Sequence, residues 1–266
     1  MSKLFSILTL IFICYVAFGI LLFLLQRSFI YYPSPPIDHP FDNIAVINDS
    51  VTINTIHVNR GKRKAILYFG GNAEVVALTA IDFAQQLNGF TQVFVDYRGY
   101  GRSGGAPSEQ ALLSDALKVY DSLAPSYREV VVIGRSLGSG VATFLAASRP
   151  VNKLVLVTPF DSILRVAQRH YPIYPVSLLL KDKFDSLAYA SDIKVETLIL
   201  AAEKDGIIHP SHTENLANAL GDKYTTFSVI KGAHHNDISL DDRYYRLIDE
   251  FLTRDGARID SANYSK

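Results

Sequence analysis

A serine set between two glycines carries the strongest chemical signal in the sequence. Residues 134–138 read Gly-Arg-Ser-Leu-Gly, follow the apolar run 130–133 and precede a helix-like stretch. A sharp turn from a strand into a helix needs small residues on both sides, and it lifts the serine oxygen clear of the backbone near the positive helix start. We therefore predict that Ser136 is a nucleophile. Ser139 lacks the pattern, because Leu137 stands where the preceding glycine is required.

A serine nucleophile needs a base, and the base needs an acid that orients it. On this kind of turn, the acid and then the histidine follow the serine along the chain. Asp205 comes after the apolar run 197–202, at the carboxyl end of a predicted strand, where ligand sites of open α/β sheets lie. Asp161 also ends a strand and is the rival acid. His234 and His235 both follow the last predicted strand, and by position either one is a candidate base.

Acyl chemistry also requires N–H donors for the oxygen that becomes negative. One predicted donor is the backbone amide of Leu137, directly after the serine. The second is expected from residues 70–73, Gly-Gly-Asn-Ala, whose glycines allow a close backbone approach, and Asn72 is the predicted residue. This loop does not match a phosphate-binding Gly-x-x-x-x-Gly-Lys pattern, and no His, Asp and Glu cluster has the spacing of metal ligands. The sequence therefore predicts chemistry without a cofactor or a metal.

Alternating strands and helices must position these groups. Two apolar runs, 44–47 and 51–58, flank a polar turn and predict an antiparallel hairpin. Short apolar runs that suit strands buried on both faces of a parallel sheet then follow at 65–69, 92–97, 129–134, 153–158, 197–202 and 226–230. Helix-like stretches lie between and after them, at 73–87, 108–123, 137–148, 211–220 and 243–253. The alternation predicts a mostly parallel, doubly wound α/β sheet, and residues 162–192, which break the rhythm, predict a small lid over the strand ends.

The amino-terminal stretch 4–25 is uncharged and apolar. As a helix, its 22 residues would extend about 33 Å, enough to cross a hydrocarbon core of about 30 Å. We expect an uncleaved anchor over residues 1–29, a catalytic domain over 30–254 and a polar tail over 255–266. A cleaved signal peptide and a buried core helix are the alternatives.

A signal peptide would normally be cut at a small residue such as Ala17 or Gly19, but the apolar run continues beyond both. Lys3 and the terminal amine precede the segment, whereas only Arg27 follows it closely, and this bias favours a non-cytoplasmic domain.

The composition excludes other classes of protein. Lys and Arg number 26 and balance 26 Asp and Glu, so the chain lacks the basic excess of a nucleic-acid-binding protein. A single cysteine, Cys14, excludes an intrachain disulfide framework.

Together these features resemble the serine α/β-hydrolases, specifically the membrane-anchored α/β-hydrolase-domain proteins. The resemblance extends from about residue 30 to residue 251 and depends on Tyr31-Tyr32-Pro33, Gly71-Asn72-Ala73, residues 96–104, residues 134–138, Asp205 before Ile207-Ile208, and His235-Asn236-Asp237. The family pattern has one histidine before Asn-Asp, so the resemblance implies that His235 is catalytic and His234 is an additional residue. The family usually has His-Gly-Asn-Ala in the first loop, whereas this chain has Gly70 in place of that histidine.

The resemblance implies an α/β-hydrolase fold and a serine hydrolase of carboxylesterase, thioesterase or lysophospholipase type. Ser136 would attack the acyl carbon, His235 would move the proton, Asp205 would orient the imidazole, and water would cleave the acyl-enzyme. The expected partners are a small acyl ester or thioester, including lipid-derived ones, and the membrane. A serine peptidase and a membrane-tethered binding protein without turnover are the alternatives. The apolar lid beside a bilayer favours single-chain acyl esters over peptides.

Overall fold

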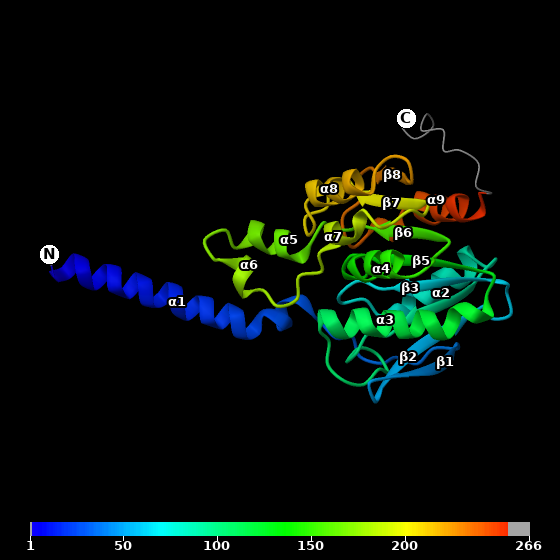
Figure 1. Cartoon of the computed structure of the whole chain (residues 1–266), viewed down its shortest axis with the longest axis horizontal. Coiled ribbons are helices and arrows are strands. Elements are labelled where there is room, and N and C mark those ends of the chain that lie inside the picture. The colour runs from blue at the N-terminus through cyan, green and yellow to red at the C-terminus, as the bar shows by residue number, and fades with distance from the viewer. Residues whose placement is uncertain (1, 255–266) are drawn as a thin grey trace.

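One sheet forms the centre of the molecule (Figure 1). The computed structural model describes residues 2–254, and within them eight strands pair in the order β1-β2-β4-β3-β5-β6-β7-β8. The strands are β1 Asp42–Asn48, β2 Val51–Val58, β3 Lys64–Phe69, β4 Thr91–Val95, β5 Glu129–Arg135, β6 Lys153–Val157, β7 Thr197–Ala202 and β8 Thr225–Ile230. The pairings β1–β2 and β2–β4 are antiparallel and the others are parallel, which confirms the predicted hairpin and the mostly parallel sheet.

Helices cover both faces of this sheet, as the doubly wound prediction requires. Alternation along β3 shows why: Leu67 and Phe69 contribute to one core, whereas Ile66 and Tyr68 contribute to the other. The first core also contains buried residues of α3 Glu109–Leu123, α4 Leu137–Ser148 and α8 Pro210–Leu220, and the second contains those of α2 Val76–Gln86 and α9 Asp242–Thr253. Burial on both faces explains why these strands read as continuous apolar runs.

Helix α2 begins later than its sequence pattern predicts. The pattern predicts a helix over 73–87, but α2 starts at Val76. The Glu74 carboxylate accepts a hydrogen bond from the N–H of Gly71 at 2.7 Å, and this contact holds the residues before Val76 as a loop. The shorter helix leaves that loop free to lie beside the nucleophile turn.

The lid, residues 162–192, separates β6 from β7. It contains the short helices α5 Ile163–His170, α6 Val176–Leu179 and α7 Ser186–Ala190. Its base is closed by an antiparallel bridge between Ser162 and Asp185 and by a hydrogen bond from the Leu187 N–H to the Asp161 carbonyl. Helices α5 and α6 project from the body of the molecule toward α1 (Figure 1).

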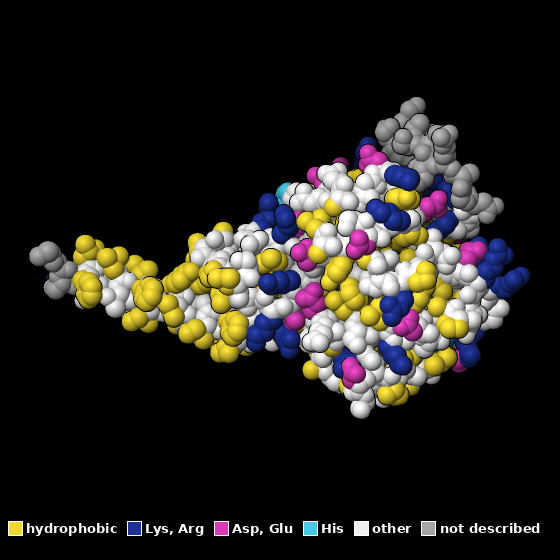
Figure 2. Space-filling view, viewed as in Figure 1, with side chains coloured by type: hydrophobic (Ala, Val, Ile, Leu, Met, Phe, Trp, Pro, Cys, Tyr) yellow, Lys and Arg dark blue, Asp and Glu magenta, His cyan; other side chains and the backbone are white. Residues whose placement is uncertain are grey.

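Helix α1, Ser2–Ile30, extends away from the body as a long arm (Figure 1). Its segment Lys3–Ile30 has a mean hydropathy of 2.9 and is about 42 Å long, so its length and composition suit a membrane span. Apolar side chains cover this arm in the space-filling view (Figure 2). The predicted tail, 255–266, lies outside the described residues.

Candidate active site

Ser136 occupies a strained turn between β5 and α4. Its φ of +49° and ψ of −114° place a non-glycine residue in a region that side chains rarely adopt. Gly134 and Gly138 make the turn possible. A Cβ on Gly134 would collide with the carbonyl of Gly138, and a Cβ on Gly138 would collide with the carbonyl of Phe69 in β3. Glycine is therefore required at both positions, because the backbones of β3, β5 and α4 approach one another closely at the serine.

The side chains of Ser136, His235 and Asp205 form one hydrogen-bonded series. His235 Nε2 lies 2.8 Å from Ser136 Oγ, and His235 Nδ1 lies 2.7 Å from Asp205 Oδ2. An ionised carboxylate can only accept, so the imidazole carries its proton on Nδ1 and presents a free Nε2 to the serine hydroxyl. Through such a series a proton can leave the hydroxyl as the oxygen attacks.

Backbone contacts orient Asp205. Its Oδ1 accepts the N–H groups of Ile207 at 2.9 Å and Ile208 at 2.8 Å, which leaves Oδ2 for the imidazole. Asp205 and His235 are both buried, and the low local dielectric strengthens the bond between them.

The two rival candidates lie elsewhere. His234 is exposed, and its backbone N–H donates to Asp237 Oδ1 at 2.6 Å. Asp161 is fully buried, but its Oδ1 lies 2.8 Å from His212 Nδ1, and its Oδ2 accepts from Asn215 Nδ2 at 3.0 Å. The chain therefore contains a second buried Asp–His pair, which the sequence analysis did not predict.

The predicted donor loop packs against Ser136. A Cβ on Gly71 would lie 3.7 Å from Ser136 Cβ, so the backbone next to Asn72 is in contact range of the serine. The Asn72 side chain is held in place, because its Oδ1 accepts the Tyr32 N–H at 2.9 Å and the Tyr100 hydroxyl at 3.0 Å. The two predicted donor amides, those of Asn72 and Leu137, thus belong to segments that flank Ser136.

Glu74 supports this loop, although no sequence motif marks it. Besides the Gly71 N–H, its carboxylate accepts the hydroxyls of Tyr68 at 2.9 Å and Thr79 at 2.6 Å. Burial raises the pKa of Tyr68 well above its usual range, and the charge of Glu74 raises it further, so the phenol remains a donor. Glu74 stands three residues after Gly71, a spacing that gave no signal of its own.

Arg135 joins the donor loop to the histidine loop. Its guanidinium lies 3.7 Å from Glu74 Oε2 and donates to the Asn236 carbonyl at 3.1 Å. Burial works against its charge, but Glu74 and the neighbouring tyrosines more than offset that effect, and the pKa of Arg135 is raised. Arg135 stands at the position of the Gly-x-Ser-x-Gly pattern that can be any residue, so the pattern does not indicate a role for it. Within residues 2–254, no three His, Cys, Asp or Glu side chains are placed to hold a metal ion.

A central parallel sheet with a nucleophile turn after β5, and with acid and histidine after later strands, defines an α/β hydrolase. The chain belongs to the α/β-hydrolase family, which confirms the resemblance seen in the sequence. A family model described as serine aminopeptidase, S33, matches residues 61–188. An uncharacterised protein of Mycobacterium tuberculosis is 32% identical over 259 residues, covering 90% of this chain and 92% of that protein.

Two further comparisons concern named hydrolases. The lysophosphatidylserine lipase ABHD12 of Mus musculus is 29% identical over 239 residues, which cover 78% of this chain and 57% of that lipase. The structure of the Pyrococcus furiosus esterase Pf2001 superposes with a TM-score of 0.66 at 15% identity, and the match covers 83% of this chain and 98% of that one. At that identity the superposition establishes the fold alone.

Proposed function

We propose that this protein is a serine hydrolase that cleaves carboxylic esters or thioesters through an acyl-enzyme. The observation that carries the proposal is the series from Ser136 Oγ through His235 to Asp205, with distances of 2.8 and 2.7 Å. A relative named as a lysophosphatidylserine lipase supports the substrate class.

The reaction proceeds in two halves. Ser136 Oγ bonds to the acyl carbon while His235 Nε2 takes the hydroxyl proton, and the carbonyl electron pair moves onto the oxygen. The tetrahedral intermediate then collapses, and the leaving alcohol or thiol takes the proton from His235. Water repeats the sequence on the acyl-enzyme and releases the acid.

Charge development sets the roles of the other groups. The imidazole becomes positive during each half-reaction, and the buried Asp205 carboxylate stabilises that charge and fixes the ring. The amides of Leu137 and Asn72 donate to the oxygen that becomes negative. Glu74 and Arg135 act indirectly, because they position the donor loop and the histidine loop.

Helix α1 is a retained anchor in this proposal. A cut after Ala17 or Gly19 would remove Tyr15, whose ring stacks on Tyr174 of the lid at 4.6 Å. We expect the catalytic domain on the non-cytoplasmic side, and protease protection in sealed vesicles tests that orientation.

Active-site labelling of the full-length chain tests the proposal. A fluorophosphonate probe should label the wild type and Ser139→Ala, and Ser136→Ala should abolish both labelling and ester turnover. Turnover of chromogenic esters, thioesters and aminoacyl anilides identifies the substrate class. Faster cleavage of anilides would favour the peptidase alternative, and a wild type that is neither labelled nor active would favour a binding protein.

A further inference from the structure

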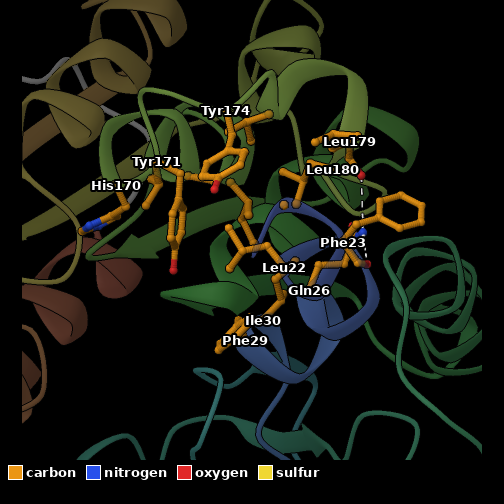
Figure 3. Close-up of a pocket in the computed structure, with 15 residues that line it drawn as sticks. Leu22, Phe23, Gln26, Phe29, Ile30, His170, Tyr171, Tyr174, Leu179 and Leu180 are labelled. Atoms are coloured by element: carbon orange, nitrogen blue, oxygen red, sulfur yellow. Dashed lines mark hydrogen bonds between the residues drawn. The ribbon is translucent and has the colours of Figure 1, made fainter. Parts of the chain in front are cut away.

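An apolar groove lies between α1 and the lid (Figure 3). It encloses about 440 Å³, within the range of sites that bind small organic ligands. Its walls include Leu22, Phe23 and Ile30 from α1 and Val166, Tyr171 and Leu179 from the lid. We propose that this groove binds the acyl chain of a bilayer lipid, which enters sideways from the leaflet in which the lid is inserted. The inference rests on the proposed function, for which it supplies the substrate site.

Contacts along α1 determine how deeply the lid lies in the bilayer. At one end, the Tyr15 hydroxyl donates to the Ile173 carbonyl at 2.8 Å, and the Tyr174 hydroxyl donates to the Tyr15 carbonyl at 3.1 Å. At the other end, Gln26 Oε1 accepts the Lys181 N–H at 2.7 Å. Gln26 lies eleven residues after Tyr15, a distance of about 16 Å along the helix and roughly half of a hydrocarbon core of about 30 Å. A lid attached over this length occupies one leaflet when α1 spans the bilayer.

The outer surface of the lid suits a hydrocarbon environment. Ile173 is 69% exposed and Leu178 is 83% exposed. Apolar side chains continue from the α1 arm onto the region of α5 and α6 (Figure 2). Irregular backbone is tolerated at membrane depth where protein groups satisfy it, and Tyr15 and Gln26 supply such groups to the Ile173 carbonyl and to the backbone near α6.

Basic side chains mark the level of the lipid head groups. Lys and Arg side chains gather where the apolar arm meets the body (Figure 2). Arg165 and Arg169 on α5 and Lys181 after α6 are exposed, and none of the three has an ion-pair partner within residues 2–254. Unpaired cations beside an apolar surface complement anionic phosphates at a membrane surface.

The end of the groove at Ile30 and Ile163 is connected to the candidate active site through short stretches of chain. Ile30 lines the groove, and two residues later the N–H of Tyr32 donates to Asn72 in the donor loop. On the opposite wall, Ile163 begins α5 shortly after β6, whose Val157 carbonyl accepts the N–H of Ser136 at 2.9 Å. In this proposal the acyl chain lies in the groove with its ester end at Ile30 and Ile163, the end connected to Ser136.

The lining favours an acyl chain over a peptide. A peptide would leave its backbone N–H and C=O groups unpaired against apolar walls, which is unfavourable. Gln26 is the one amide among the lining residues, and its side chain already bonds to Phe23, Leu179 and Lys181. A hydrocarbon chain requires no such partners.

Fluorescence quenching tests occupancy without any need for turnover. The sequence contains no tryptophan, so each single substitution is the sole indole in the full-length chain. Tyr171→Trp reports on the groove and Leu178→Trp on the outer lid. Ser126→Trp is the control, because Ser126 is exposed shortly before β5, at the opposite end of that strand from Ser136. In phosphatidylcholine vesicles with brominated acyl chains, the first two should be quenched and the control should not. Quenching of Tyr171→Trp and Leu178→Trp no stronger than that of Ser126→Trp would overturn the proposal.

Filling the groove tests its role in catalysis. Ala167→Trp places bulk in the groove, Leu22→Trp does so from the α1 side, and Gln168→Trp on the exposed face of α5 is the matched control. Both filling variants should lower kcat/KM for a long-chain monoacyl ester in vesicles by about tenfold, because the displaced chain loses buried methylenes. Turnover of a water-soluble acetate ester should stay within about twofold in all three.

The outcomes separate the two proposals. An equal loss on both substrates, or no loss on either, in both filling variants would overturn the groove assignment. If the wild type hydrolyses neither ester, the proposed function fails, and the quenching experiment still decides whether lipid chains occupy the groove.

Discussion

Arg135 donates a hydrogen bond to the carbonyl of Asn236 across 101 residues of chain, at 3.1 Å. The same guanidinium lies 3.7 Å from Glu74, which holds the Gly71 N–H at 2.7 Å. One side chain next to Ser136 thus connects the loop that carries His235 to the loop that carries the predicted oxyanion donor. The Arg135 guanidinium therefore helps to position both loops.

This connection predicts that Arg135 acts through position rather than by contact with the substrate. Arg135→Gln should lower kcat by about tenfold or more and leave KM nearly unchanged, because misplacement of a reacting group lowers the rate of the bound state. Glu74→Gln should have a similar effect on kcat. In the double variant, the loss of activation free energy should be smaller than the sum of the losses in the two single variants. Steady-state kinetics of all three variants measure the coupling between Arg135 and Glu74. Additive losses would mean that the two residues act independently.

The two adjacent histidines should behave differently. His235→Ala should lower kcat by about 10⁴-fold, since members of such a unit fail together. His234→Ala should remain close to wild type, because its exposed ring lies outside the hydrogen-bonded series. The check is kcat for both variants, with thermal unfolding to show that each is folded. An inactive, folded His234→Ala beside an active His235→Ala would require the base to be reassigned.

The two buried Asp–His pairs should also separate function from stability. Asp205→Asn should lower kcat by about 10⁴-fold, because the imidazole loses the anion that fixes its tautomer. Asp161→Asn should cost about 1–3 kcal/mol of folding free energy and little activity, because its carboxylate satisfies His212, Asn215 and Ser162. Denaturant unfolding and kcat, measured on both variants, test the division. Loss of activity without loss of stability in Asp161→Asn would give that pair a role in the reaction.

The parts of this molecule that have local signatures were predictable from the sequence. Apolar runs located the strands to within one or two residues at most boundaries, and residues 134–138 placed Ser136 at the end of a strand. The choice of Asp205 rather than Asp161 as the acid beside His235 was a choice between two similar strand ends. Only the fold shows that Asp161 faces His212.

Contacts between distant segments were not predictable from the sequence. Glu74 and Arg135 are 61 residues apart, and neither lies in a pattern that names the other. The Glu74 contact with Gly71 also delays the start of α2, which a count of apolar positions cannot detect. The stack of Tyr15 on Tyr174 joins the amino-terminal helix to the lid, and nothing local to either residue indicates it.

His57 should make stability depend on pH. Its ring lies on β2, with Nε2 2.9 Å from Thr55 Oγ1, and the Thr55 hydroxyl donates its own proton to the Ile44 carbonyl. Thr55 Oγ1 therefore accepts a hydrogen bond from the Nε2–H group of His57. Burial and, to a smaller extent, the charge of Arg60 lower the pKa of His57 from 6.5 to about 4, and Asp42 opposes the change in part.

The direction of this pH dependence follows from the protonation states of His57 in the folded and unfolded chain. Between pH 6.5 and about 4 the unfolded chain binds a proton at His57 that the folded chain does not, so the free energy of unfolding falls as the pH falls. After allowance for solvent screening at a partly exposed ring, the loss from pH 7 to pH 4 is about 2 kcal/mol. His57→Gln keeps a side-chain N–H donor for Thr55 but cannot be protonated. Urea unfolding of the full chain in detergent micelles should therefore show a shallower decline for the variant, and parallel curves for the two proteins would contradict the assignment.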